Sequence, residues 1–397
     1  MHVNPLSAAM ARAGVQDLGA SRIREVANAG LGREDVLPFW FGEPDQVTPL
    51  FIRDAAKTAL DAGDTFYTHN CGLPELRATL ATYLSALHGP IGAERIAVTS
   101  SGVSALMLLA QLVINPGDRV VAITPLWPNL VEIPKILGAD VHEVALQCGA
   151  IWELDVEALL AALTPGTRAL FLNSPNNPTG WVITRSQQKI ILTHCRRHGI
   201  WILADDVYER LVFDGAAAGH EAACAPSFLD IADPDDRLIC ANSFSKSWLM
   251  TGWRLGWAVV PSTMLADLAK LIEYNTSCAP GFVQRAGLVA IEQGEAVIAA
   301  TVARYQASRD FLHARLNALP GITAPLPKGA MYLFFEIEGC RDTLSLCKQL
   351  VREAGLGLAP GSAFGPHGEG YLRWCFASSP ERLEAGAQRL EHFLQRS

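Results

Sequence analysis

The sequence lacks the features that mark several classes of protein. It has no block of Lys and Arg, and its formal net charge is −8, so we expect neither a nucleic acid nor a membrane as a partner. The nine cysteines include no CxxC pair, and the N-terminus has no charged segment followed by an apolar core. We therefore expect a cytoplasmic protein that acts on small molecules.

Charged residues are also scarce, at 18% of the total, whereas 50% of the residues are hydrophobic. This composition excludes a disordered chain, and 397 residues exceed what one hydrophobic core usually supports, so two domains are expected. The stretch at 96–117 carries no charge, but its Ser and Thr residues and its ending in Asn115, Pro116 and Gly117 indicate a strand, a turn and a helix rather than a membrane span.

Between about residues 90 and 260, short apolar runs alternate with polar loops and longer helical patterns. That alternation predicts an α/β fold with a mostly parallel central sheet flanked by helices. We assign six strands to the runs at 96–98, 120–123, 169–172, 200–204, 238–241 and 255–260. A helix with a basic last turn should end at Gly199, just before the fourth strand.

The pattern changes beyond residue 280. A helical stretch over 284–319 and strand-like alternation over 330–337 predict a smaller α+β domain. The first 45 or so residues are too short to fold alone, so we expect them to pack on this part. The predicted division is a large domain at 48–280 and a small domain formed by 1–47 with 281–397.

Ligands of open α/β sheets bind beyond the carboxyl ends of the strands, so the residues there are of interest. After the first strand, Ser101, Gly102, Val103 and Ser104 form a turn before a helix, whose free N–H groups suit a phosphate, although an ordinary turn is the alternative. After the second strand, Trp127 lies in a loop, where its ring either stacks on a heteroaromatic ligand or fills the core.

The next two strands end in polar residues as well. The loop at 173–180 is able to present an Asn side chain, though it also has ordinary turn chemistry. The fourth strand ends at Asp205, with Tyr208 close behind. A carboxylate buried there needs a cationic partner, and a helix N-cap is the alternative.

The fifth strand leads into Ser243, Ser245 and Lys246, and Arg254 follows. A single lysine is by default a surface residue, but this one lies beside strands. Together the five segments supply a lysine, a carboxylate, a stacking ring, hydroxyl groups and a phosphate cup at one sheet edge. Pyridoxal phosphate requires all of these groups.

The stretch at 67–373 resembles the class I and II aminotransferases, pyridoxal phosphate enzymes of fold type I. The segments at 173–180, 243–246 and 251–256 match that family's most specific motifs almost letter for letter. By this resemblance the enzyme serves amino acid metabolism: it moves an amino group between an L-amino acid and a 2-oxo acid, with pyridoxal 5'-phosphate bound in the large domain.

The resemblance also implies a role for each site residue. Lys246 is the Schiff-base lysine and proton shuttle, and Asp205 pairs with the pyridine nitrogen. Tyr208 and Asn177 contact the phenolic oxygen, while Trp127 covers the ring. The phosphate would be held by Ser101, Gly102, Val103, Ser243, Ser245 and Arg254. Val103 is a departure, since some relatives have a hydroxyl there, and the bulk of Trp248, Leu249 and Met250 is another.

The remaining correspondences concern the substrate and a second subunit. Arg373 would grip the α-carboxylate bidentately, and Gly42 belongs to a loop that lets the backbone approach the substrate. Tyr67 matches a tyrosine that reaches the neighbouring subunit's phosphate. The resemblance therefore implies a homodimer with shared active sites.

Other readings stay open at this point. His194 and His198 with Cys195 could form a metal site, although a basic helix end explains them, and we expect no metal. A lyase or decarboxylase on the same scaffold is the rival chemistry, and a non-catalytic sensor is the rival class.

We expect a neutral or aromatic substrate, because no further cation stands in a matched motif to pair with a second carboxylate. Arg22, Arg24 or the other subunit could still supply one. Aromatic residues in segments that should border the pocket are Trp40, Phe41, Trp181 and Tyr332.

Overall fold

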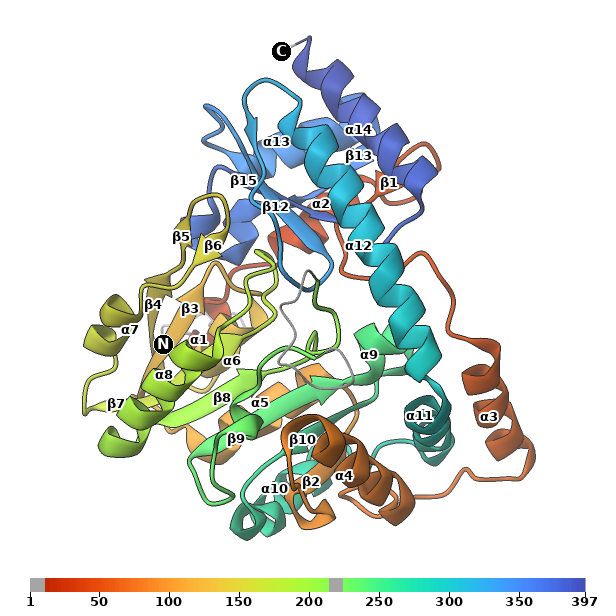
Figure 1. The fold of residues 1–397 in the computed structure, drawn as a ribbon, viewed down its shortest axis with the longest axis vertical. Coiled ribbons are helices and arrows are strands. Elements are labelled where there is room, and N and C mark those ends of the chain that lie inside the picture. Colours follow the sequence, from red (N-terminus) through yellow and green to blue (C-terminus); the bar gives the residue numbers. More distant parts are fainter. Residues whose placement is uncertain (1–10, 214–223, 397) are drawn as a thin grey trace, which may run out of the picture.

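The computed structural model describes residues 11–213 and 224–396. Its centre is a seven-stranded sheet (Figure 1). In spatial order the strands are β2 (Ile96–Thr99), β10 (Gly256–Val259), β9 (Leu238–Ser243), β8 (Trp201–Asp205), β7 (Thr167–Asn173), β3 (Arg119–Thr124) and β4 (Asp140–Ala145). All neighbouring pairs are parallel except those that β10 makes with β2 and β9. The predicted fold class and all six predicted strands are confirmed.

Helices cover both faces of this sheet. Successive strand residues point to opposite faces, and both faces are apolar, so each needs a covering layer. Val120 and Ala122 pack with α5 (Gly102–Val113), α6 (Asn129–Ile136) and α10 (Leu265–Glu273). Val121 and Ile123 belong to the larger core on the other face, which includes residues of α4 (Pro74–His88), α7 (Val156–Ala162) and α8 (Arg185–His198). As predicted, α8 ends at Gly199, which adopts the left-handed conformation with φ 65°.

A second, smaller sheet lies toward the C-terminus (Figure 1). It is antiparallel, in the order β11 (Ile322–Thr323), β12 (Tyr332–Ile337), β15 (Tyr371–Cys375) and β14 (Ala359–Pro360). With it lie α12 (Glu295–Asn317), α13 (Thr343–Gln349) and α14 (Pro380–Leu394). This part matches the smaller α+β unit that the sequence predicts.

The N-terminal segment packs largely on this C-terminal part. Helix α2 (Arg22–Ala29) contacts α13 and β14, and β1 (Leu37–Pro38) pairs in parallel with β13 (Leu356–Gly357). Helix α1 (Ala13–Gln16) lies instead against α6. The domain limits at 47/48 and 280/281 remain a prediction.

The predicted helix at 284–319 is two helices, α11 (Gly281–Gln293) and α12, bent by 76°. The break lies at Gly294, where a Cβ would overlap the Ala290 carbonyl oxygen and the Trp248 ring. Helix α11 packs on α3 (Leu50–Asp61) and α4. Among the described helices, none alone has the length and apolar content to cross a membrane; only this bent pair meets both criteria.

The other elements are short. They are α9 (Phe244–Ser247), β5 (Gln147–Cys148), β6 (Trp152–Glu153), η1 (Ala93–Arg95), η2 (Phe228–Asp230), η3 (Thr251–Trp253), η4 (Ser262–Met264), η5 (Leu350–Ala354), η6 (Gly361–Phe364) and η7 (Pro366–Gly368). Helix α9 follows β9 directly and η3 comes next along the chain. They bring Lys246 and Arg254 to the end of the main sheet.

Candidate active site

A cavity of about 460 Å³ lies beyond the carboxyl ends of β7, β8 and β9 and is closed by residues of β12 and β15. It brings together most of the predicted site residues: Gly42, Gly102, Val103, Trp127, Asn177, Asp205, Tyr208, Ser243, Ser245, Lys246, Arg254 and Arg373. Two predicted residues do not line it. Ser101 is buried beside it, and Tyr67 is 90% exposed.

Lys246 lies on α9, a single turn capped by the Ser243 side chain. Its Nζ donates a hydrogen bond to the carbonyl oxygen of Gly42 and lies 5.8 Å from the centre of the Tyr208 ring. Desolvation of the partly buried side chain lowers the pKa of Lys246 to about 8. Near neutral pH this lysine therefore has a larger neutral, nucleophilic fraction than an exposed lysine.

Asp205 ends strand β8 and is only 4% exposed. Its Oδ1 accepts a hydrogen bond from the Val207 backbone N–H at 3.3 Å, and a turn rather than a helix follows, so it is not a helix N-cap. No cation in the described ranges forms an ion pair with it, and burial raises the pKa of Asp205 to about 7. This carboxylate fits a cationic ligand.

Arg373, on β15, is the third buried ionisable group. Its Nη1 donates to Asn177 Oδ1 at 2.9 Å, and its Nη2 donates to the Trp40 carbonyl oxygen. Its Nε has no hydrogen-bond partner, and no acidic side chain among residues 11–213 and 224–396 pairs with it. A buried guanidinium held by neutral oxygens has its charge available for a carboxylate.

Aromatic residues surround these groups. Tyr208 and Tyr332 share a hydrogen bond of 2.6 Å between their hydroxyls, and the Arg373 guanidinium lies 4.5 Å from the Tyr332 ring centre. A Cβ at position 42 would overlap the Tyr332 hydroxyl, so only glycine fits there. Of the four predicted aromatic wall residues, Phe41 and Tyr332 line the cavity, Trp40 contributes its carbonyl oxygen, and Trp181 lines a different cavity.

The cavity floor has the form of an anion cup. Ser101 caps α5 by accepting from the Ser104 N–H at 3.0 Å, and the first turn of α5 has N–H groups without intrahelical partners. A Cβ at Gly102 would lie 3.0 Å from the Ser243 Cβ. The Ser243 hydroxyl donates to the Ser245 hydroxyl at 2.9 Å. Arg254 adopts a left-handed backbone conformation, φ 54°, and lines the cavity.

These groups fit the expected cofactor. Pyridoxal phosphate offers a pyridine nitrogen for Asp205, a carbonyl carbon for Lys246 and a phosphate for the cup. The residue at position 102 must be small, because a Cβ there would crowd Ser243 in this cup. The bulky residues that depart from the family pattern lie outside the cavity. Trp248 packs against Phe244 and Trp257 in the core.

Sequence reasoning missed several residues of the site. Asn173 holds the loop beside the cavity, because its side chain accepts from the Asn177 N–H at 2.7 Å and donates to the Asp205 carbonyl oxygen at 2.9 Å. Arg24, named only as a possible extra cation, lines the cavity with its guanidinium 4.7 Å from the Phe41 ring centre. No motif marks Arg24, although the position of Asn173 at a strand end could have marked it.

Comparisons with known proteins agree on one family. The model for aminotransferase class I and II matches residues 34–390. The chain is 34% identical over 379 residues to an aspartate aminotransferase of Pyrococcus horikoshii, covering 94% of this chain and 95% of that protein. It is 33% identical over 384 residues to aromatic-amino-acid aminotransferase 2 of Thermococcus litoralis, with 94% and 96% covered. A single mutant of Thermus thermophilus aspartate aminotransferase matches with a TM-score of 0.89 at 30% identity, covering 97% of this chain and 99% of that one.

Proposed function

Because this chain belongs to the class I and II aminotransferases, and so moves amino groups between amino acids and 2-oxo acids with pyridoxal 5'-phosphate, we propose a role for each residue of its cavity. One observation carries the proposal: Lys246, Asp205 and Arg373 reach a single cavity without an ion pair to any described side chain. The relatives named above are aminotransferases, which favours transfer over the alternatives of a lyase, a decarboxylase or a non-catalytic protein.

The cofactor supplies a carbonyl carbon that combines with amines and a pyridine ring that withdraws electrons. Lys246 Nζ would hold the cofactor through that carbon, and the same nitrogen would take and return the proton at the substrate's α-carbon. A pKa of about 8 suits both directions of this transfer near neutral pH. The Asp205 carboxylate holds a proton on the pyridine nitrogen, which keeps the ring electron-withdrawing.

The other cavity residues orient these reactants. Tyr208 and Asn177 would bind the phenolic oxygen, and Trp127 would cover the ring. Arg373 binds the substrate's α-carboxylate, with Gly42 keeping the wall beside it free of a side chain. The phosphate is held by Ser101, Gly102, Val103, Ser243, Ser245 and Arg254.

The enzyme works as a homodimer in the cytoplasm. Tyr67 is 90% exposed and Phe66 is 82% exposed, so this segment is free to reach a second subunit, where the Tyr67 hydroxyl would bind the partner's phosphate. All nine cysteines are free thiols, which agrees with a reducing compartment.

The preferred amino acid has an apolar or aromatic side chain. Phe41, Ile23 and Tyr332 line the cavity, and an adjoining cavity of about 630 Å³ shares Ile23 and Trp127 with it and leaves room for a bulky side chain. A dicarboxylic substrate is the second candidate. It is favoured by Arg24, whose guanidinium forms no ion pair within the described residues.

Steady-state kinetics on a panel of amino acids test this choice. We expect kcat/KM for phenylalanine and leucine to exceed that for aspartate and glutamate by about tenfold, which is about 1.4 kcal/mol. Aspartate winning by the same factor would contradict the substrate proposal. Arg24→Met then tests whether Arg24 binds the side-chain carboxylate, because it should lower kcat/KM for aspartate and glutamate only.

A further inference from the structure

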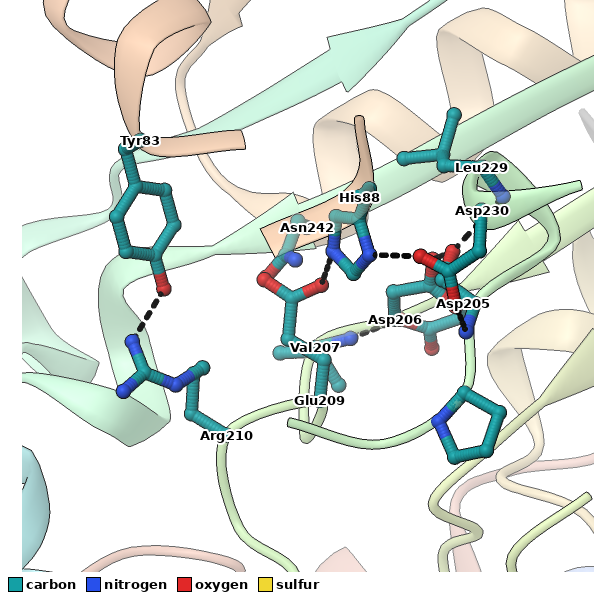
Figure 2. A network of polar contacts seen from close by, with 12 residues as sticks. Tyr83, His88, Asp205, Asp206, Val207, Glu209, Arg210, Leu229, Asp230 and Asn242 are labelled. Carbon is teal, nitrogen blue, oxygen red and sulfur yellow. Dashed lines mark hydrogen bonds and ion pairs between the residues drawn. The ribbon is translucent and has the colours of Figure 1, made fainter. Parts of the chain in front are cut away.

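A closed ring of buried hydrogen bonds lies next to Asp205 (Figure 2), and none of its residues lines the cavity. One member of this ring is His88, the last residue of α4, whose side chain is 0% exposed. His88 Nδ1 lies 2.6 Å from Asp230 Oδ1, and Nε2 lies 3.0 Å from Glu209 Oε2. Each ring nitrogen thus faces a different carboxylate.

The ring closes through two further residues. Asp230 Oδ2 accepts from the Ser227 N–H at 3.0 Å, and the Ser227 hydroxyl donates to Asp206 Oδ2 at 2.8 Å. The Glu209 N–H donates to the Asp206 carbonyl oxygen at 2.9 Å. The path therefore runs from His88 through Asp230, Ser227, Asp206 and Glu209 back to His88.

This ring holds the turn that carries two cavity residues. Asp205 directly precedes Asp206, and Tyr208 directly precedes Glu209. The backbone of Asp206 is also fixed to β9, because its N–H donates to the Ala241 carbonyl oxygen at 2.9 Å. A shift of either Asp206 or Glu209 would therefore move the Asp205 carboxylate or the Tyr208 hydroxyl.

The hydrogen-bond chemistry fixes the charge of His88. An ionised carboxylate only accepts hydrogen bonds, so two carboxylates on one imidazole require a proton on both ring nitrogens. The same contacts raise the pKa of His88 well above its usual value against the effect of burial. The third neighbour, Cys224, is a buried thiol whose pKa is raised to about 11, so it adds no charge.

The charge of His88 also matters for its surroundings. Glu209 and Asp230 are both buried, and Arg185 pairs with Asp230 from the other side. Burial and the nearby Glu209 raise the pKa of Asp206 to about 8. Without a cation at position 88, the buried Glu209 carboxylate would lose this partner, and its uncompensated charge would lie in the turn that carries Asp205 and Tyr208.

We propose that His88 is a positioning residue, an imidazolium that clamps Glu209 and Asp230 and thereby holds Asp205 and Tyr208 in place for the cofactor. It touches neither cofactor nor substrate, so it acts only through the turn at 205–209. The proposal rests on the proposed role of Asp205. His88, Glu209 and Cys224 also form a group whose ligand atoms lie within 4.8 Å of one another, so a bound metal ion is the competing explanation of the cluster.

The first test measures His88 in the unmodified holoenzyme. Enzyme labelled with 15N in its histidines is observed by NMR from pH 6 to 9, and the His88 signal is assigned as the one that changes in Glu209→Gln. Both ring nitrogens should be protonated at pH 7, where an ordinary histidine is mostly neutral. One unprotonated ring nitrogen at pH 7, or stoichiometric metal in the purified holoenzyme by elemental analysis, would overturn the proposal. This readout does not depend on the role of Asp205.

The second test compares variants. His88→Gln should weaken cofactor binding by about tenfold and lower kcat by a similar factor, while KM for the amino acid stays unchanged because Arg373 is not affected. The matched control is His194→Gln, a partly buried histidine on α8 that hydrogen-bonds the Leu163 carbonyl oxygen, lies 4.5 Å from the His198 ring and should change neither. Adding Glu209→Gln to His88→Gln removes the unpaired charge and should recover part of the loss.

Two results would contradict the positioning role. One is a folded His88→Gln enzyme with unchanged cofactor affinity and kcat. The other is a loss that appears equally in KM, which would indicate general damage to the cavity. If His88→Gln does not fold, the NMR measurement on the unmodified enzyme still decides. If His88→Gln behaves as expected but Asp205→Asn has no effect, then the proposed function of Asp205 fails and not the clamp.

Discussion

The two sides of the turn after β8 differ in whether their buried ionisable groups have ion-pair partners. On the cavity side, Asp205 and Arg373 are buried without ion pairs to described side chains. On the other side, His88 contacts two carboxylates and every member of its ring is hydrogen-bonded. Leaving a buried charge unpaired is costly, so a folded protein keeps such charges only where a ligand will pair with them. We therefore assign ligand binding to the cavity side, whose charges are unpaired, and structural support to the side around His88, whose charges are paired.

Removal of Lys246 should have the largest effect. Lys246→Ala deletes the group that we assign to both cofactor attachment and proton transfer, so kcat should fall by about 10³-fold or more with the fold retained. Transamination assays and circular dichroism measure the two quantities. The control Lys57→Ala, at a lysine with 63% exposed side chain, should change neither. A loss below tenfold in Lys246→Ala would refute the assignment.

The paired and unpaired carboxylates should respond differently to the same substitution. Asp205→Asn should lower kcat by about 100-fold without reducing the stability of the apoenzyme, because it removes an unpaired charge. Asp230→Asn should cost the apoenzyme about 3 kcal/mol, because it breaks buried contacts with His88 and Arg185. Urea unfolding of the two variants measures the difference. Equal destabilisation would remove the distinction between the two sides.

The pH dependence of apoenzyme stability sharpens the same comparison. The pKa of Asp205 is raised to about 7, so between about pH 4 and pH 7 the folded state keeps a proton that the unfolded chain has lost. Its contribution to stability is therefore present at low pH and lost as pH rises, by about 1.4 kcal/mol per pH unit. Asp205→Asn should remove this part of the slope and leave the part due to Asp206, whose pKa is raised to about 8. Urea unfolding at several pH values in this window measures it, and an unchanged slope would contradict the raised pKa.

The smallest expected signal comes from the subunit contact. Inactive Tyr67→Ala and Lys246→Ala subunits, once mixed, form a hybrid with one site that has both residues intact. That site should restore a fraction of the activity. Native mass spectrometry checks that heterodimers form, and no recovery in their presence would exclude a shared site.

The sequence predicts the main sheet well because its central strands are buried on both faces and so appear as continuous apolar runs. Strand β4 was missed because it is a short, charged edge strand in which only Val144 is buried, so it shows no apolar run. The antiparallel direction of β10 could not be predicted, since an apolar run carries no information on strand direction. The cavity residues were predictable from their places at strand ends.

The paired side was not predictable in the same way. His88, Glu209 and Asp230 come from separate segments and follow no shared motif, and only the folded chain brings their side chains together. The sequence predicted the N-terminus of α5 at Gly102 and the position of Lys246 just after β9, because the local sequence pattern determines both. It named Arg24 only as one of several possible cations for the pocket and did not place His88 beside the turn at 205–209, because long-range packing determines both positions.

The central claim is that Lys246 carries the cofactor, and chemical trapping tests it most directly. Borohydride reduction of the holoenzyme makes the lysine–cofactor bond permanent, and peptide mapping by mass spectrometry then locates the pyridoxyl group. We expect the group on Lys246, in the peptide that also contains Ser243 and Ser245. A pyridoxyl group on another lysine, or on none, would contradict it.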